Sequence, residues 1–485
     1  MLRGAGVDYF FTRIVILRIL LVHPEYLSEG IGFRLAAMPE PLGLELVAAA
    51  VDERHEIRIL DMRIDGELGG AIYDFDPQVV AVTALTPEVC AARDVVRRTK
   101  ELSGDVFTVI GGHHASLLPE DFFIPEVDAI AVGEGEISFP SLIEALDKRP
   151  FGALRTASAL RDVPNLIWRD EDGEFIRNPI STERVNMDNL AIPRRDLTQA
   201  YRDEYFFLFD KPDTSVATGR GCPYRCNFCS VWEFYSGITS QMSARRVITE
   251  LENISTDHVT FVDDNFLMNN RRENEIADMI RSAGIRKRFS MECRTDSIVR
   301  HPELVKKWVD IGLYAVLLGL EGASDKTLES VNKNNTTDIN NEALKILRDN
   351  GVIIWGAFIV DPEWEVDDFK RLRDYVTEQQ ITHTQFTVLT PLPGTELYRN
   401  KKSELLTNDY RCFDTMHAVS PTRLDREEFY RQFANLYRQS DLGPYYDLVR
   451  EGKLTIANVK QGKAMLEAAS NWQAYLPQDP ILGNA

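Results

Sequence analysis

The chain has 485 residues, of which 44% are hydrophobic, so it is long enough for two or three domains with cores of their own. Its formal net charge of −20 at pH 7 disfavours a nucleic-acid-binding role. Its six cysteines do not suggest a disulfide framework and favour a reducing, cytoplasmic location. The apolar N-terminus is interrupted by Arg13 and Arg18, so it predicts neither a transmembrane segment nor a signal peptide.

Strands and helices alternate over residues 14–150. Helical patterns, for example at residues 42–51 and 87–102, lie between several apolar runs. Continuous apolar strands separated by helices are typical of a parallel, doubly wound sheet, which binds ligands at the carboxyl ends of its strands. The apolar runs that we expect to be strands are residues 18–22, 57–60, 79–82, 106–110 and 129–132.

Small and polar residues follow the ends of three of these expected strands. They are Thr83 and Thr86, then Gly111, Gly112, His113 and His114, and then Gly133, Glu134 and Gly135. Small residues let backbone amides approach a large ligand closely, although two glycines can equally form an ordinary turn. A histidine in such a loop is more often a hydrogen-bonding residue than a metal ligand. No GxGxxG follows the first strand, so a dinucleotide site is not expected.

A connector is expected over residues 151–210. Residues 165–179 have the strand–turn–strand pattern of a hairpin, with Glu171, Asp172 and Gly173 at the turn. The proline-marked residues 190–197 follow it. A second alternation of strands and helices then begins near residue 211.

Three cysteines lie close together in TGRGCPYRCNFC, residues 218–229. Cys222, Cys226 and Cys229 form a CxxxCxxC pattern, and three thiolates on a glycine-rich loop can hold an iron–sulfur cluster. A four-iron cluster with three protein ligands leaves one iron open to a small molecule. The alternative is a zinc site or a set of reduced structural thiols. Zinc usually needs a fourth ligand nearby, and no histidine lies within twenty residues of Cys229.

Residues 211–396 predict a partial barrel of six β/α units, whose active site lies at the carboxyl ends of the strands. Polar residues follow these ends: Asp263 and Asp264, then Glu292 and Arg294, then Glu321. The two aspartates could instead cap a helix, and Glu321 could be a buried ion-pair partner. The expected strands are residues 215–218, 259–262, 289–293, 315–320, 353–360 and 384–389. The expected helices are residues 244–254, 273–283, 302–311, 341–349 and 366–378.

The remaining residues, 397–485, predict a mostly helical region. Within residues 426–438, Phe429, Phe433, Leu436 and Tyr437 share one helix face, which favours core packing over ligand binding.

The cysteine loop, with Phe228 directly before its last cysteine, resembles the radical S-adenosylmethionine (SAM) superfamily. GGHHAS at residues 111–116, VGEGE at 132–136 and TPLPGT at 390–395 resemble the subclass with a cobalamin-binding domain before the radical SAM core. The implied α/β fold has an N-terminal doubly wound, Rossmann-like cobalamin-binding domain, a partial (β/α)6 radical SAM barrel and a helical C-terminal region. A DxHxxG motif is absent, which implies base-off cobalamin without a protein histidine on cobalt.

The resemblance also implies roles for individual residues. The three cysteines would hold a 4Fe-4S cluster, and His113 and His114 would lie beside the corrin and hydrogen-bond to it. The loops at residues 111–116 and 133–136 should face the cysteine loop over one cavity, partly closed by C-terminal helices. The implied SAM contacts are Phe228, Asp263, Asp264, Arg294, Glu321 and Ile359. The implied cobalamin contacts are Thr83, Thr86, Gly111, Gly112, His113, Gly133, Glu134 and Gly135.

Within the subclass, residues 413–430 look most like hopanoid C-3 methylases. The resemblance implies a methyltransferase in which a 5′-deoxyadenosyl radical takes hydrogen from an unactivated carbon and methylcobalamin supplies the methyl group. The implied partners are a small-molecule substrate such as a polycyclic lipid, reached from a membrane surface, and a flavodoxin or ferredoxin as one-electron donor. The alternatives are a radical SAM cyclase of the anaerobic tetrapyrrole type and a non-catalytic cobalamin-binding sensor. A methylthiotransferase would need a second cysteine triplet, and residues 14–150 contain only Cys90.

Overall fold

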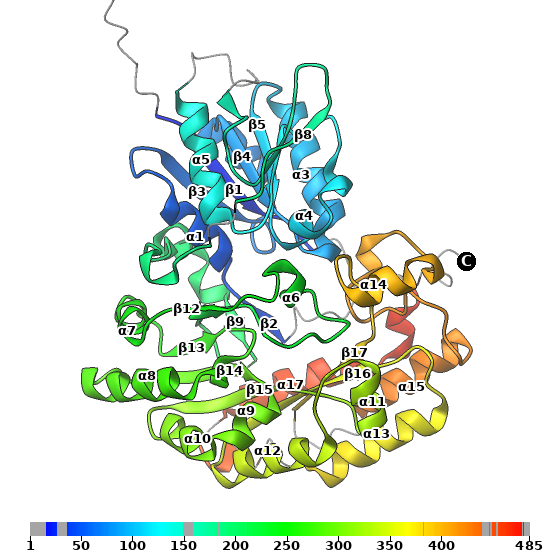
Figure 1. Cartoon of the computed structure of the whole chain (residues 1–485). Helices are drawn as coiled ribbons and strands as arrows, with labels where there is room; N and C mark the ends of the chain where they lie inside the picture. Colours follow the sequence, from blue (N-terminus) through cyan, green and yellow to red (C-terminus); the bar gives the residue numbers. More distant parts are fainter. Residues whose placement is uncertain are drawn as a thin grey trace, which may run out of the picture.

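The computed structural model describes residues 16–26, 36–148, 159–181, 184–208, 210–381, 383–438, 446, 449–452, 454–477 and 479. Two large sheets organise these residues, and Figure 1 shows the first sheet above the second, with the cysteine-loop region between them. Among the residues described, no helix has the length and apolar character needed to cross a bilayer.

The first sheet has seven strands in the order β3-β1-β4-β5-β6-β7-β8. Its five parallel strands are those predicted from the apolar runs, and the order reverses between β1 and β4. A reversal of this kind opens a crevice at the carboxyl ends of the strands. The bounds are β1 Arg18–His23, β3 Glu56–Asp61, β4 Val79–Thr83, β5 Phe107–Gly111 and β6 Ala129–Ala131.

Helices cover both faces of this sheet. Helices α1 (Leu42–Ala50) and α5 (Gly135–Asp147) share one core with the sheet, and α2 (Leu68–Phe75) and α3 (Val89–Leu102) share another. Strand β1 shows why, because Leu21 packs into the first core and Leu20 into the second. Alternate side chains of a strand point to opposite faces, and both faces are buried here.

The predicted hairpin is present as β7 (Leu166–Arg169) and β8 (Phe175–Arg177). The hairpin is not part of a separate connector between the two sheets, because β7 pairs antiparallel with β6 and extends the first sheet. The structural link to the second sheet is the 3₁₀ segment Arg195–Glu204. There Arg195 donates to Glu40 Oε1 at 3.0 Å, to Glu250 Oε1 at 2.7 Å and to the carbonyl oxygen of Ser215 at 2.9 Å. One buried guanidinium therefore joins both sheets.

The second sheet has six parallel strands in the order β10-β13-β14-β15-β16-β17, as expected of a partial barrel. Each predicted strand and helix is present with small shifts at its ends, while the short helices α9 (Thr295–Arg300) and α11 (Asp325–Ser330) were not expected. The strands are β10 Asp213–Val216, β13 His258–Phe261, β14 Arg288–Cys293, β15 Leu313–Glu321, β16 Ile353–Val360 and β17 His383–Val388. The helices are α7 Ala244–Glu252, α8 Asn270–Ala283, α10 Pro302–Val309, α12 Thr337–Asp349 and α13 Val366–Glu378.

The C-terminal region contains α14 (Glu396–Lys401), α15 (Arg426–Arg438) and α17 (Ile456–Ala469). Between α14 and α15 it has only short 3₁₀ turns, so this stretch is less helical than predicted. Phe429 and Phe433 of α15 are fully buried in the core of the second sheet, which confirms the packing role of that helix face.

Candidate functional site

A cavity of about 410 Å³ lies between the two sheets, and both contribute to its walls. From the first sheet it is lined by Thr83, Gly111, Gly112, His113, Gly133, Glu134, Gly135 and Glu136. From the second it is lined by Ala217, Gly219, Arg220, Phe234, Tyr235, Val262 and Asp264. The carboxyl-end loops of the first sheet therefore face residues that flank the cysteine loop on either side. No described residue after Asp264 lines the cavity, so the expectation that C-terminal helices partly close it is wrong.

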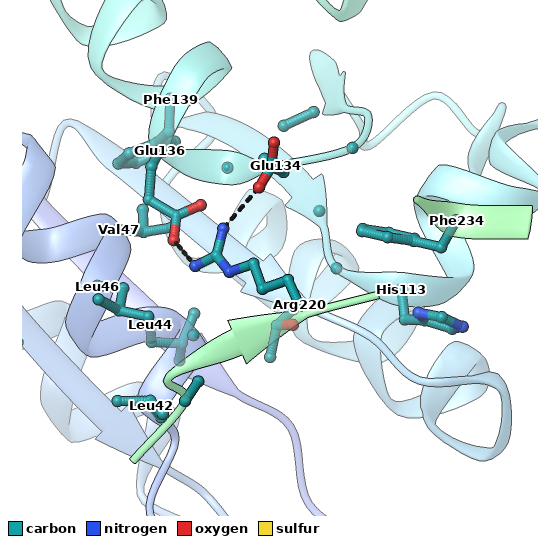
Figure 2. A pocket seen from close by; sticks show the side chains of 18 of the residues that line it. Leu42, Leu44, Leu46, Val47, His113, Glu134, Glu136, Phe139, Arg220 and Phe234 are labelled. Carbon is teal, nitrogen blue, oxygen red and sulfur yellow. Dashed lines mark hydrogen bonds and ion pairs between the residues drawn. The ribbon is translucent and has the colours of Figure 1, made fainter. Parts of the chain in front are cut away.

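The wall between α1 and α5 is apolar. Figure 2 shows an apolar slot here, with Phe139 of α5 on one side. The other side is formed by four residues of α1: Leu42, Leu44, Leu46 and Val47. This slot suits an apolar part of a ligand, because few polar groups there need a partner. No sequence pattern predicted it, since the same residues are also typical of an ordinary core-facing helix.

Two of the predicted glycines are required by the backbone around the cavity. Gly112 has a φ of +94°, and a Cβ there would lie 2.5 Å from Thr83 Oγ1. Gly135 leads into α5, and a Cβ there would lie 2.8 Å from Val47 Cγ2. Any side chain at these positions would displace the cavity wall. These two glycines are therefore needed for the close packing of the protein around the cavity.

The two adjacent histidines differ in environment. His114 is fully buried, with Nδ1 3.1 Å from Thr86 Oγ1 and Nε2 3.0 Å from Asp121 Oδ2. Thr86 does not line the cavity, and its hydroxyl supports His114 behind the loop. His113 does line the cavity, and burial lowers its pKa to about 4, with a smaller contribution from His114, so its ring is neutral at neutral pH.

Charged side chains cross the cavity. Arg220 on β11 (Gly219–Arg220) binds Glu134 Oε1 at 2.8 Å and Glu136 Oε1 at 2.5 Å, and Figure 2 shows its guanidinium between the two carboxylates. All three side chains are at least nine-tenths buried. The GEGE sequence thus supplies two carboxylates to the residue that lies two positions before Cys222, an interaction that the sequence did not predict.

The start of the cysteine loop is fixed by the two aspartates after β13. Asp263 accepts hydrogen bonds from Thr218, and Asp264 Oδ2 accepts one from the backbone N–H of Gly221 at 2.9 Å. Burial raises the pKa of Asp263 to about 6, and the hydrogen bonds from Thr218 oppose that rise. Asp264 also lines the cavity. Asp263 is buried, so its carboxylate serves the loop.

The three cysteines are partly or fully buried within one loop. Burial raises the pKa of each thiol, to about 12 for Cys229, and Cys222 and Cys226 add to the rise at Cys229. A bound cation reverses this preference, because it deprotonates a coordinating thiol. No group of three or more His, Cys, Asp or Glu side chains in the described ranges converges closely enough to hold one metal ion. A four-iron cluster separates its sulfur ligands more widely, and three soft thiolates fit such a cluster.

Arg294 lies beside this loop. Its Nη1 is 4.0 Å from Cys226 Sγ, and its guanidinium stacks 3.5 Å above the ring of Tyr224. Asp296 binds its Nε at 2.9 Å, so the position of the guanidinium is set before a ligand arrives. A carboxylate near Cys226 would find a cation there, and the predicted contact between Arg294 and SAM is chemically reasonable.

Glu321 ends β15 in a strained conformation. Its φ is +62°, which is uncommon for a residue with a side chain, and its Oε1 binds Lys333 Nζ at 2.6 Å. Gly319 makes room for this pair, since a Cβ there would lie 2.8 Å from both Glu321 Oε1 and Lys333 Nζ. Strain of this kind is often kept at ligand sites. The pair also agrees with the alternative role given to Glu321 from the sequence, that of a buried ion-pair partner.

Glu292 of β14 was not among the predicted contacts. It is exposed although both neighbours on the strand are buried, and no hydrogen bond or ion pair of its carboxylate is recorded within the described ranges. Although water reaches this side chain, the protein around it disfavours the charged form and, with the charge of Asp264, raises its pKa to about 7. Its place at the carboxyl end of a strand singled it out in the sequence, but the implied SAM contacts did not include it. Phe228 and Ile359 do not line the cavity, and their roles stay predictions.

The C-terminal segment at residues 413–430 is part of the core. His417 is buried, with Nδ1 2.9 Å from Asp414 Oδ2 and Nε2 3.1 Å from the carbonyl oxygen of Tyr475. Buried Arg426 pairs with Asp479 at 3.0 Å. The polar residues of this segment therefore bind one another and the chain end rather than facing the cavity.

Two family models match the chain: the B12 binding domain over residues 30–143 and the Radical SAM superfamily over residues 216–376. The hopanoid C-3 methylase of Methylococcus capsulatus is 33% identical over 427 residues, which cover 85% of this chain and 78% of that protein. The anaerobic magnesium-protoporphyrin IX monomethyl ester cyclase of Rubrivivax gelatinosus is 24% identical, with coverage of 87% and 77%. Among solved structures, the cobalamin-dependent S-adenosylmethionine radical enzyme OxsB matches 96% of this chain and 72% of its own, with a TM-score of 0.69 and 18% identity.

Proposed function

This chain belongs to the cobalamin-dependent radical SAM methyltransferase family, and from that membership we propose that it methylates an unactivated carbon of a polycyclic, hopanoid-like lipid. The observation that carries the proposal is the shared cavity between the two sheets. A methyl donor and a radical source must reach the same carbon, so their sites must face each other. The carboxyl ends of the first sheet and the flanks of the cysteine loop do so across this cavity.

The 4Fe-4S cluster, SAM and cobalamin, when bound, supply the radical that removes a hydrogen atom and the methyl group that replaces it. In the proposed arrangement, Cys222, Cys226 and Cys229 hold the cluster, and Arg294 lies where a SAM carboxylate would bind. Gly133, where a Cβ would meet no atom within 4 Å, leaves the backbone open to the corrin at the first sheet. The apolar slot between α1 and α5 excludes water from the cobalamin side.

The lipid assignment is supported by the hopanoid C-3 methylase relative rather than by a pocket of matching shape. Several residues of the segment 413–430, which carried the sequence resemblance, are buried scaffold, among them His417, Arg426 and Tyr430. We further propose that a flavodoxin or ferredoxin supplies the electron and that the lipid is taken from a membrane surface. The cysteine loop is the part of the chain that such a donor must approach.

The test is an anaerobic assay of the reconstituted protein that measures 5′-deoxyadenosine and S-adenosylhomocysteine together. With a hopanoid acceptor, we expect both products in equal amounts and a lipid heavier by one methylene. A magnesium-protoporphyrin ester acceptor should give neither a cyclised product nor 5′-deoxyadenosine above background. Formation of 5′-deoxyadenosine alone with that acceptor would favour the cyclase alternative. A protein that binds cobalamin but forms neither product with either acceptor would contradict the proposal.

A further inference from the structure

The cysteine loop is attached to the first sheet at both of its ends. Arg220 lies two residues before Cys222, and Ser230 directly follows Cys229. Both contact loops of the first sheet, and these are the two loops that line its side of the cavity. The rest of the loop contacts the second sheet and the segments that follow it.

The attachment at the carboxyl end depends on His113. Its Nε2 lies 2.8 Å from Ser230 Oγ, within hydrogen-bond distance. Its ring also stacks on Phe234 of α6 (Val231–Phe234), with centroids 5.0 Å apart and planes inclined by 16°. Figure 2 shows the two rings side by side at the end of the cavity. His113 thus makes one polar and one aromatic contact with the chain just after Cys229.

The backbone sets His113 in this place. Gly112, with its φ of +94°, turns the chain out of β5, and α4 (His113–Leu117) begins at His113. The next residue, His114, donates its backbone N–H to the carbonyl oxygen of Ala84 at 3.0 Å. With its neighbours held on both sides, the imidazole has little freedom to leave Ser230.

We propose that His113 is a positioning residue, which with Arg220 fixes the cysteine loop at a set distance and angle from the cobalamin side of the cavity. The inference rests on the proposed function and adds to it the element that aligns the two cofactor sites. Hydrogen abstraction and methyl transfer must both occur at one carbon, with reacting atoms about 3–3.5 Å apart, and an error of about 1 Å can cost a hundredfold in rate. Loss of the contact should therefore uncouple the two steps while leaving each cofactor bound.

The experiment compares His113→Phe, which keeps the stacking but loses the hydrogen bond, with Ser230→Ala, which removes only the partner hydroxyl. Each should lower the ratio of methylated product to 5′-deoxyadenosine about tenfold, and the double variant should be no worse than either single variant. His113→Gln, whose amide can still reach Ser230, should recover most of the ratio. The matched control is Arg399→Gln. It removes the 2.5 Å ion pair between Arg399 and Glu233, which lies on the same helix α6. That variant should keep the wild-type ratio.

A second readout does not depend on turnover. Dipolar electron paramagnetic resonance between the reduced cluster and cob(II)alamin should show a broader distance distribution in His113→Phe and Ser230→Ala than in the wild type or Arg399→Gln. An unchanged distribution and product ratio would overturn the proposal. So would a loss of cobalt in His113→Phe with a normal Ser230→Ala, because His113 would then be a direct corrin contact. If the wild type methylates nothing yet the distributions broaden, the proposed function fails and the positioning role stands.

Discussion

The carboxylate of Asp263 accepts two hydrogen bonds from Thr218, one from the Thr218 backbone N–H at 2.6 Å and one from the Thr218 hydroxyl at 2.7 Å. Asp263 lies two residues after strand β13 of the second sheet and Thr218 begins the cysteine loop, so the segment that follows the strand holds the first turn of that loop. Gly219 fits beneath this contact, where a Cβ would lie 2.8 Å from Asp263 Oδ2. The loop is therefore shaped by protein contacts that do not involve the cysteines.

A cysteine substitution should consequently remove the cluster and leave the fold intact. We expect Cys222→Ala, Cys226→Ala and Cys229→Ala each to lose reductive SAM cleavage, because no thiolate nearby can replace the missing ligand. Iron content and 5′-deoxyadenosine yield measure the loss, and circular dichroism checks the fold. Cys293→Ala is the control, since Cys293 is buried on β14 and should keep a full complement of iron. A wild-type yield from any of the three variants would contradict the cluster assignment.

Cobalamin should bind without a nitrogen ligand on cobalt. His114 has both ring nitrogens engaged by Thr86 and Asp121, and His113 is held at Ser230. Electron paramagnetic resonance of the cob(II)alamin form should show no axial nitrogen splitting. A splitting that disappears in His113→Phe or in a variant of His114 would show that one of these contacts breaks when the cofactor binds.

Blocking the apolar slot should separate the two half-reactions. Val47 lies half-buried on α1 and faces the cavity, so Val47→Phe fills the slot without adding a polar group. We expect the variant to lose cobalt, to keep its iron and to form 5′-deoxyadenosine without methylation. Gly112 is a poorer target, because a Cβ there would collide with Thr83. Full methylation by Val47→Phe would show that cobalamin does not use the slot.

The joint between the sheets should make stability depend on pH. Burial, with the nearby charge of Glu40, raises the pKa of Glu45 to about 8 from an unfolded value near 4.5. Between these values the folded state holds the extra proton, so this group's contribution to stability falls as pH rises towards 8. Glu45→Gln should remove that fall. Between pH 6 and pH 8, its free energy of unfolding, measured with urea, should exceed that of the wild type by about 1–3 kcal/mol. Glu252→Gln, at an exposed position, should follow the wild type throughout.

The C-terminal polar cluster should matter for stability and not for substrate choice. Asp479→Asn leaves Arg426 buried with a weaker partner. It also removes the carboxylate that accepts a hydrogen bond from the Tyr430 hydroxyl at 2.6 Å. Removing one partner of a buried ion pair typically costs about 3–5 kcal/mol, so we expect a large drop in melting temperature. Below that temperature, the relative rates with different lipid acceptors should equal those of the wild type. A changed preference with an unchanged melting temperature would assign the cluster to substrate binding.

Local patterns predicted much of this molecule. Apolar runs located the parallel strands of both sheets, and the turn residues located the hairpin. The glycine and cysteine spacings located the loops that meet at the cavity, because all of these signals depend on neighbours in the chain. The contacts of Arg220 with Glu134 and of Thr218 with Asp263 join residues far apart in sequence, and no local pattern reports them. For the same reason the hairpin gave no sign that β6 was its partner.

Arg195 resists separation of the two sheets. It binds Glu40 beside the first sheet and both Glu250 and Ser215 at the second, and all of these partners are buried. Parting the sheets would strand this guanidinium away from its carboxylates, which is costly in a low-dielectric interior. We therefore expect small molecules to enter and leave the cavity through movements of loops and side chains. Such movements take nanoseconds to microseconds, whereas the hinge motions that this joint resists take microseconds to milliseconds.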